Sequence, residues 1–280
     1  MAAVARELHM PDLAYVLGHS ERELERLRTQ ARLIEPITRG FFREAGIAPG
    51  MRVLDIGSGA GDVAFLAAEL VGPTGEVLGI DRAAVAVAAA TRAARERGLA
   101  NVAFREGDAA RMRFERPFDA VVGRYVLLYQ ADAGATLRAL SRHLRKGGLV
   151  VFHEPDWKAA RSSPATPAYD NCWRWLQERF RRAETDGNMA DRLYGIFVRA
   201  GLQAPQMRMQ TFIAGGAAAH PMIEALAELV GTLATTFEEL GIATAAEMDV
   251  VTLATRMKQE IAAVDAMVLG RSEVCAWARV

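Results

Sequence analysis

Three glycines stand at alternate positions in residues 55–62, which read Asp-Ile-Gly-Ser-Gly-Ala-Gly-Asp. The apolar run 51–54 precedes this stretch and a helical pattern begins near Val63, so the order is strand, turn and helix. Because glycine has no Cβ, the backbone can turn sharply here and approach a ligand closely. The N–H groups that open the following helix would then point at that ligand. These features predict a nucleotide-binding loop.

The spacing of acids and glycines separates two kinds of nucleotide site. Asp81 ends a second short apolar strand, where a nucleotide-binding βαβ unit carries a ribose-binding carboxylate. The dinucleotide fingerprint G-x-G-x-x-G, read from Gly57, requires glycine at position 62, where this chain has Asp62. The loop instead reads D-x-G-x-G-x-G, and we expect Asp62 to be the N-cap of the helix.

This loop, together with Asp81 and the later pair Gly107-Asp108, resembles the class I S-adenosylmethionine-dependent methyltransferases. The similarity is strongest to the small-molecule branch that includes quinone-biosynthesis methyltransferases, and it covers residues 51–156. It implies that S-adenosylmethionine is the cofactor and that S-adenosylhomocysteine is the product.

The resemblance also implies roles for single residues. Asp55 and the backbone of the loop glycines would hold the methionine part of the cofactor, and Asp81 would bind both ribose hydroxyls. Asp108 would accept from the adenine amino group. Taken singly, Asp81 could be a solvent-facing acid and Asp108 a turn residue, but their order and spacing favour a binding site. The predicted cofactor-binding residues are Tyr15, Asp55, Gly57, Gly59, Gly61, Asp81, Arg82, Asp108, Ala109 and Arg124.

One of these residues has a second interpretation. Arg124 follows the fourth strand and would either pair with the cofactor carboxylate or pack over the ring of Tyr125. Tyr15 resembles an N-terminal tyrosine that closes over the cofactor in some relatives.

His153 and Glu154 lie just past the fifth strand, near the expected position of the methyl group. An imidazole has an unperturbed pKa of about 6.5 and can accept a proton near neutral pH. We therefore predict His153 as the proton acceptor and Glu154 as the second catalytic candidate. The alternative for His153 is a strand-end histidine bonded to backbone. No metal site is predicted, because no group of His, Cys, Asp and Glu has ligand spacing.

Strand and helix patterns alternate as a parallel doubly wound sheet requires. The predicted strands are 51–54, 77–81, 101–106, 118–122, 149–153, 206–214 and 273–279. The resemblance implies that the last strand is antiparallel and lies between the fifth and sixth. The predicted fold is thus α/β, a doubly wound, mostly parallel seven-stranded sheet of Rossmann-like type with a helical cap.

Three regions follow from these patterns. Residues 1–48 form an N-terminal helical cap segment whose first helix opens with a capping box at Ser20 and Glu23. Residues 49–156 form the cofactor-binding core. Residues 157–280 complete the sheet and carry helical cap insertions at about 157–187 and 216–270. Within them we expect a loop at 161–167 and one helix from a capping box at Thr244 to Gly270.

Composition limits the partners of the chain. The 280 residues carry equal numbers of acidic and basic side chains, whereas nucleic-acid binding usually requires a basic surplus. The two cysteines are too few for a disulfide framework. No apolar run is long enough to span a membrane, and the N-terminus lacks the apolar core of a signal peptide. We expect a cytoplasmic protein with a small-molecule acceptor.

The expected activity is methyl transfer to oxygen or carbon of a small, ring-containing metabolite. Aromatic and methionine side chains in the predicted cap suit a flat apolar molecule. Two alternatives stay open. One is an NAD-type oxidoreductase, which Asp62 opposes, and the other is a protein that binds S-adenosylmethionine without catalysis.

Overall fold

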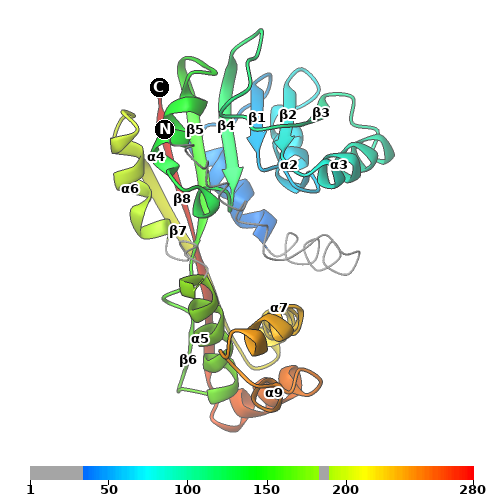
Figure 1. The fold of residues 1–280 in the computed structure, drawn as a ribbon, viewed down its shortest axis with the longest axis vertical. Coiled ribbons are helices and arrows are strands. Elements are labelled where there is room, and N and C mark those ends of the chain that lie inside the picture. Colours follow the sequence, from blue (N-terminus) through cyan, green and yellow to red (C-terminus); the bar gives the residue numbers. More distant parts are fainter. Residues whose placement is uncertain (1–33, 183–188) are drawn as a thin grey trace, which may run out of the picture.

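A computed structural model describes residues 34–182 and 189–280. Its centre is one eight-stranded sheet in the order β3-β2-β1-β4-β5-β8-β6, with β7 paired to β8 (Figure 1). In the part of this order from β3 to β5, every pair of neighbouring strands is parallel. The strands are β1 (Arg52–Ile56), β2 (Glu76–Asp81), β3 (Val102–Glu106), β4 (Phe118–Arg124), β5 (Leu144–Asp156), β6 (Arg161–Ser163), β7 (Gln206–Gly215) and β8 (Met267–Arg279). The predicted α/β fold class is confirmed.

The last strand has the predicted direction and neighbours. β8 is antiparallel to both β5 and β7 and lies between them. It begins at Met267, earlier than the predicted 273, and its first residues pair with the short strand β6. β6 falls in a segment predicted as a loop, and it is the eighth strand of a sheet predicted to have seven. Pairing with β6 and β7 supplies backbone hydrogen bonds to the early part of β8, which extends beyond the parallel strands.

The helices follow the predicted periodic stretches, with one difference. The expected single helix from Thr244 to Gly270 is two helices, because Asp249 adopts a left-handed φ of 35° and interrupts it. The second helix ends at Ala263, because residues from Met267 onward pair in β8. The capping box of Thr244 and Glu247 is present. The helices are the stretch 34–45, α2 (Asp62–Val71), α3 (Ala84–Glu96), η1 (Leu127–Tyr129), α4 (Ala133–Ser141), α5 (Pro167–Arg182), α6 (Met189–Arg199), η2 (Gly216–Ala219), α7 (His220–Glu239), α8 (Ala245–Met248) and α9 (Leu253–Ala263).

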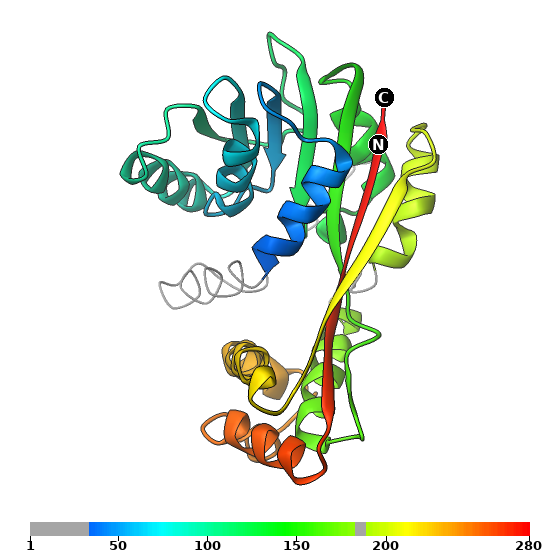
Figure 2. The same ribbon diagram turned by 180° about the vertical axis from the view of Figure 1, so that it is seen from behind.

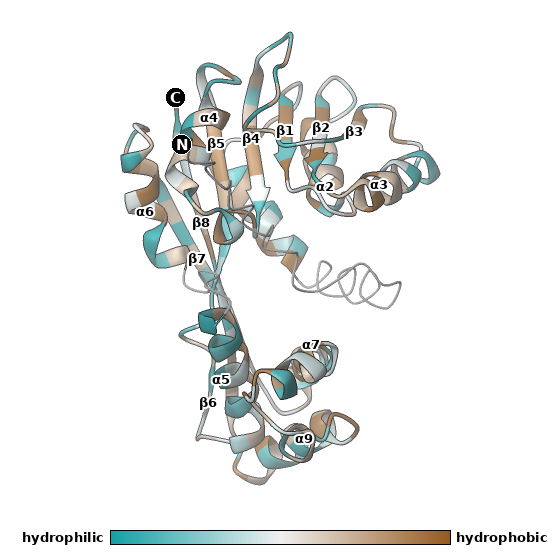
Figure 3. Ribbon diagram, in the orientation of Figure 1, coloured by the Kyte–Doolittle hydropathy of each residue, from teal (hydrophilic) through white to brown (hydrophobic). Residues whose placement is uncertain are grey.

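Apolar clusters cover both faces of the central sheet. Val121 of β4 belongs to the cluster that includes side chains of α4 and α6. Its neighbour Val122 belongs to the cluster that includes α2 and helix 34–45. Successive side chains of a strand point to opposite faces, so β4 is apolar on both, as a buried parallel strand should be. Figure 3 shows the hydrophobic colouring of these central strands.

A helical lobe of α5, α7, α8 and α9 surrounds a third apolar cluster. β7 and β8 run continuously from the sheet into this lobe (Figure 2). Both predicted insertions, at about 157–187 and 216–270, contribute helices to it. Trp157, Trp173 and Trp175 are buried there. The arrowheads of β1 and β4 point toward the side on which the lobe lies (Figure 1), so the lobe faces the edge where parallel sheets bind ligands.

The N-terminal cap is described in part. Helix 34–45 packs on the sheet through Ile37, Phe41 and Phe42. The predicted capping box at Ser20 and Glu23 and the predicted cofactor residue Tyr15 lie outside the described residues. Of the helices in the described ranges, none is both long enough and apolar enough to cross a bilayer.

Candidate functional site

The loop after β1 has the geometry that its glycines predicted. Gly57, Gly59 and Gly61 all have left-handed φ angles, of 62°, 51° and 96°. A Cβ added at Gly57 would lie 2.8 Å from Val126 Cγ2, and one at Gly61 would lie 2.7 Å from Phe65 Cζ. Both positions therefore need glycine for conformation and for space.

The start of α2 differs from expectation by one residue. Gly61 occupies the N-cap position in the left-handed conformation, without a side-chain cap, and α2 begins at Asp62. The prediction of Asp62 as the N-cap was thus wrong, because the left-handed turn before the helix favours glycine. Asp62 lies in the first turn, where the helix dipole favours a negative charge.

Asp55 is a buried acid at the end of β1. Its side chain is 1% exposed, and among the described residues neither carboxylate oxygen has a hydrogen-bond partner. Burial raises the pKa of Asp55 well above 3.8, and the nearby Arg124 guanidinium opposes that rise. Buried polar groups normally have partners. The Ala64 N–H faces the carboxyl group and also opposes the rise of its pKa, which leaves most of its acceptor positions for a cationic donor such as an ammonium group.

Asp81 faces the same loop from the end of β2. Its Oδ2 accepts a hydrogen bond from the Gly59 N–H at 2.8 Å, and its Oδ1 accepts from the Ala83 N–H at 2.9 Å. The residue is partly exposed. The carboxylate therefore fixes the glycine loop and still has acceptor positions for a ligand.

Asp108 lies at the end of the next strand along the edge. The Gly107 N–H donates to the Asp81 carbonyl at 2.9 Å, which joins the ends of β2 and β3. Arg82 Nη2 forms an ion pair with Asp108 Oδ2 at 2.9 Å. Arg82 therefore contacts the acid that is predicted to bind the adenine amino group. Ala109 is buried, and its carbonyl lies 2.9 Å from His143 Nε2. The structure thus brings the predicted residues of β1, β2 and β3 to one edge.

Arg124 ends β4 beside Asp55. Its Nη1 donates to Thr38 Oγ1 at 3.3 Å, which ties β4 to helix 34–45. The guanidinium lies 5.8 Å from the centre of the Tyr125 ring, at the outer limit of a cation–π contact. It is partly exposed, which leaves donors for a ligand at this edge.

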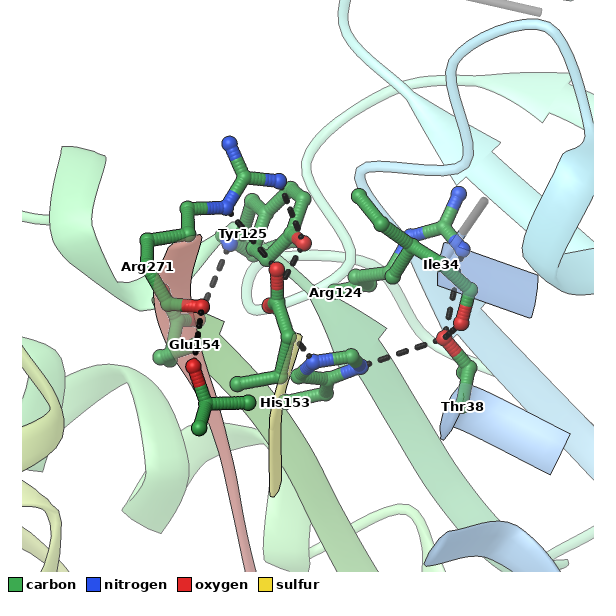
Figure 4. A network of polar contacts seen from close by, with 10 residues as sticks. Ile34, Thr38, Arg124, Tyr125, His153, Glu154 and Arg271 are labelled. Atoms are coloured by element: carbon green, nitrogen blue, oxygen red, sulfur yellow. Dashed lines mark hydrogen bonds and ion pairs between the residues drawn. The ribbon is translucent and has the colours of Figure 1, made fainter. Parts of the chain in front are cut away.

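His153 is enclosed on both sides of its ring. It is fully buried, with Nδ1 3.2 Å from Thr38 Oγ1 and Nε2 2.9 Å from Glu273 Oε2 (Figure 4). Both partners are side chains, rather than the backbone groups of the sequence-based alternative. Burial lowers the pKa of His153 below 6.5, against the opposing effect of Glu273. The imidazole is therefore neutral near pH 7, and it reaches other groups through Thr38 and Glu273.

Glu154 holds the turn after β4. Its Oε1 accepts from the N–H groups of Val126 and Leu127 at 3.0 and 2.8 Å, at the start of η1 (Figure 4). Its Oε2 has no partner among the described residues. Burial raises the pKa of Glu154 to about 8. The carboxyl group is therefore largely protonated at neutral pH and positions the segment that carries Tyr125.

Sequence reasoning missed three residues of the polar network around His153. Glu273 and Arg271 come from β8, and Thr38 comes from helix 34–45. The available signal for Glu273 was an acid directly before the apolar run 274–278 of β8. Thr38 had none, because threonine is common in helices and its contact depends on tertiary packing. Across residues 34–182 and 189–280, no cluster of His, Cys, Asp and Glu could hold a metal ion.

The sequence of this chain matches a known protein family. A family model described as a methyltransferase domain matches residues 47–201. That segment contains all the predicted cofactor residues except Tyr15, and it also contains His153 and Glu154.

Three curated relatives illustrate the similarity. Aklanonic acid methyltransferase DauC of Streptomyces sp. (strain C5) is 41% identical over 111 residues, 39% of this chain and 50% of that protein. Nocamycin O-methyltransferase of Saccharothrix syringae is 37% identical over 128 residues, 45% of this chain and 46% of that protein. Demethylmenaquinone methyltransferase of Staphylococcus saprophyticus is 31% identical over 134 residues, 48% of this chain and 54% of that protein. The chain spans about half the length of these relatives.

Solved structures share the fold. The YcgJ protein of Bacillus subtilis superposes with a TM-score of 0.56 at 19% identity, over 89% of this chain and 99% of that one. Phosphoethanolamine N-methyltransferase 2 of Haemonchus contortus, in complex with S-adenosylhomocysteine, has a TM-score of 0.54 at 18% identity, over 86% of this chain and 51% of that one.

Proposed function

Because the chain belongs to the class I S-adenosylmethionine-dependent methyltransferases, we propose that it methylates oxygen or carbon of a small, ring-containing molecule. The observation that most supports this function is the unpartnered carboxylate of Asp55, buried beside three left-handed glycines. A buried acid without a partner is costly. A bound cationic ligand would offset this cost by supplying a hydrogen-bond donor and an opposite charge.

The residues at the edge fit S-adenosylmethionine, whose positively charged sulfonium supplies an electrophilic methyl group. Asp55 would accept from the ammonium group of its methionine part. Asp81 would accept from the ribose hydroxyls and Asp108 from the adenine amino group. Three acids along the ends of neighbouring strands suit a ligand with two positive charges and several donors.

The acceptor side of the site is proposed to work mainly by positioning, which can account for a large part of a barrier. The helical lobe and helix 34–45 would cover the acceptor. His153 Nδ1 would take a proton where the acceptor must lose one. Thr38 lies between this nitrogen and Arg124, so a proton leaving the acceptor on the Arg124 side would reach Nδ1 through the Thr38 hydroxyl.

The relatives guide the choice of acceptors for an assay. The names of the three relatives refer to aklanonic acid, nocamycin and demethylmenaquinone. The full chain, incubated with S-adenosylmethionine labelled in its methyl group, should label a quinone-type or polyketide-type ring acceptor. A protein that binds the cofactor but labels neither class, while labelling an open-chain amine, would contradict the ring-containing acceptor.

Asp81→Ala should weaken S-adenosylmethionine binding by about tenfold or more, because a hydrogen bond to a charged group contributes about 1.5–3 kcal/mol. Asp81→Asn should lose less, since its amide oxygen can still accept from the Gly59 N–H. Calorimetric titration checks both. Glu106→Ala is the matched control: Glu106 is the exposed partner of Asp81 on β3, and its removal should leave affinity unchanged. Equal affinities for Asp81→Ala and wild type would remove Asp81 from the site.

Binding of cofactor and acceptor together should slow backbone hydrogen exchange in helix 34–45 and in residues 216–270. The physical reason is that a covered ligand restrains local opening of the elements that cover it. The core strands should change less. Mass-spectrometric exchange with S-adenosylhomocysteine and product measures this, and protection limited to the glycine loop would mean that these helices serve only in packing.

A further inference from the structure

The Glu273 carboxylate accepts hydrogen bonds from three side chains inside the protein. Its Oε2 accepts from the Tyr125 hydroxyl at 2.6 Å and lies 2.9 Å from His153 Nε2. Its Oε1 accepts from Arg271 Nε at 2.8 Å. Glu273 is 1% exposed. Arg271 Nη2 also donates to the Tyr125 hydroxyl at 2.9 Å, so Arg271, Glu273 and Tyr125 form a closed ring of hydrogen bonds (Figure 4).

Stability alone is a poor reason for this arrangement. Removing two charges from water is costly, and apolar residues of similar volume often replace a buried ion pair with no loss of stability. The ion pair of Arg271 and Glu273 lies where β4, β5 and β8 meet, at the carboxyl end of β5. Its placement beside His153 suggests that it serves the site.

The charge of Glu273 decides which imidazole nitrogen carries the proton. Burial would raise the pKa of Glu273, but the Arg271 charge and the hydrogen bonds from His153 and Tyr125 outweigh it and lower the pKa to about 2. An ionised carboxylate can only accept hydrogen bonds, so His153 Nε2 must donate. The neutral imidazole then has its lone pair on Nδ1, 3.2 Å from the Thr38 hydroxyl, whose proton can be donated to this nitrogen or to the Ile34 carbonyl at 3.3 Å.

The same carboxylate supports a strained turn. Tyr125 has a φ of 59°, and a non-glycine residue in this region persists only where its surroundings hold it. Its hydroxyl is fixed by Glu273 and Arg271, and its N–H donates to the His153 carbonyl at 2.9 Å. On either side of Tyr125, Arg124 lies beside Asp55 and Val126 packs against Gly57.

We infer that Glu273, supported by Arg271, is the positioning residue of the site: it fixes His153 as the Nε2–H tautomer with Nδ1 open to Thr38, and holds the Tyr125 turn beside the glycine loop. Its role in methyl transfer rests on the proposed function, whereas the tautomer is a property of the protein alone. The charged or titratable groups around His153 come from three strands. β8 contributes Glu273, Arg271 and Cys275, β5 contributes Glu154, and the end of β4 contributes Arg124 and Tyr125. Helix 34–45 contributes two groups that do not titrate, the Thr38 hydroxyl and the Phe41 ring.

Nuclear magnetic resonance of the full chain with ¹⁵N-labelled histidine tests the tautomer. The chain has five histidines, and the ring signals lost in His153→Ala identify His153. In the wild type near neutral pH, Nε2 should carry the proton and Nδ1 should be unprotonated. The double variant Arg271→Met and Glu273→Leu removes the pair without leaving a charge unbalanced, so it should fold. In it the preference for Nε2–H should disappear.

Two matched variants separate positioning from general packing. Tyr125→Phe removes one donor to Glu273 and leaves the His153 contact intact, so the tautomer should be kept. Glu273→Gln leaves one acceptor oxygen for three donors and adds an NH2 donor, so it should weaken the Nε2–H preference and lower the pKa of His153 further. A wild-type Nδ1–H tautomer, or an unchanged Nε2–H preference in the double variant, would overturn the inference.

Kinetics add a readout that depends on the proposed function. With a true acceptor, the double variant should lower kcat by about 10²-fold or more and leave S-adenosylmethionine affinity nearly unchanged. Loss of the tautomer without any change in kcat would overturn the positioning role. If the protein fails to bind S-adenosylmethionine while the tautomer behaves as described, the proposed function fails and the structural part of the inference stands.

Discussion

Asp55→Asn should stabilise the ligand-free protein and weaken its binding of S-adenosylmethionine. The wild-type carboxylate is buried without a partner, and an unsatisfied buried group costs about 1–3 kcal/mol, more when charged. The amide removes the charge at nearly constant volume. It also removes the charge-assisted hydrogen bond to the cofactor ammonium group, so affinity should fall by about tenfold or more. Denaturation of the free protein and calorimetric titration measure the two effects, which have opposite signs.

The stability gain from Asp55→Asn should depend on pH. The pKa of Asp55 in the folded protein lies well above 3.8 because of burial, so the folded state holds this proton more tightly than the unfolded state. Stability from this source is fully present below pH 3.8 and is lost as pH rises through the folded pKa. The variant lacks this titration, so its advantage should grow with pH. Equal stability at every pH, together with unchanged affinity, would show that Asp55 has partners and no ligand role.

His153→Ala should lower kcat by about 10²–10⁴-fold, because removal of a general base typically costs that much. Affinity for S-adenosylmethionine should change little, since the acids proposed to bind it lie at the ends of β1, β2 and β3 and do not contact His153. Because burial lowers the pKa of His153 below 6.5, the wild-type rate should fall only as pH drops below that range. The variant should lose this acidic limb. Steady-state kinetics across pH with the true acceptor check both.

Glu154→Gln is the control for the histidine variant. The amide oxygen of Gln can accept from Val126 and Leu127 as Glu154 does, so the turn after β4 should keep its shape. We expect a rate close to wild type. If His153→Ala keeps its rate and pH profile while Glu154→Gln loses them, the base is Glu154. If neither variant changes the rate, the enzyme acts by positioning.

The arrangement of the candidate cofactor residues could be predicted from sequence because its determinants are local. Asp55, the glycines, Asp81 and Asp108 each lie at or within a few residues of the end of a short strand. Carboxyl ends of parallel strands meet at one edge of the sheet, so order along the chain implies proximity. The three left-handed φ angles of the loop confirm the reason for glycine at alternate positions.

The acceptor half depends on contacts that local patterns do not encode. Glu273 meets His153 across 120 positions of sequence, and Thr38 meets it across 115. Both contacts require β8 to pair with β5 and helix 34–45 to cover the sheet. Sequence placed His153 at the end of the fifth strand, whereas β5 continues past it to Asp156 because these residues pair with β8. The enclosure of His153 by two side chains was visible only in the fold.

Two other differences have local causes. The interruption between α8 and α9 occurs at Asp249, which accepts a left-handed conformation more readily than most residues, and periodicity alone could not reveal it. β6 contains three residues and pairs only with the early part of β8, so it was too short to give an alternating pattern.

Calorimetric titration of the full chain with S-adenosylmethionine, S-adenosylhomocysteine and NAD tests most directly whether the carboxyl edge of β1, β2 and β3 is a cofactor site of the methyltransferase type. We expect one molecule of S-adenosylmethionine or S-adenosylhomocysteine to bind per chain, and no binding of NAD, because Asp62 stands where the dinucleotide fingerprint has its third glycine. Binding of NAD with no binding of S-adenosylmethionine would contradict the cofactor assignment and with it the proposed function.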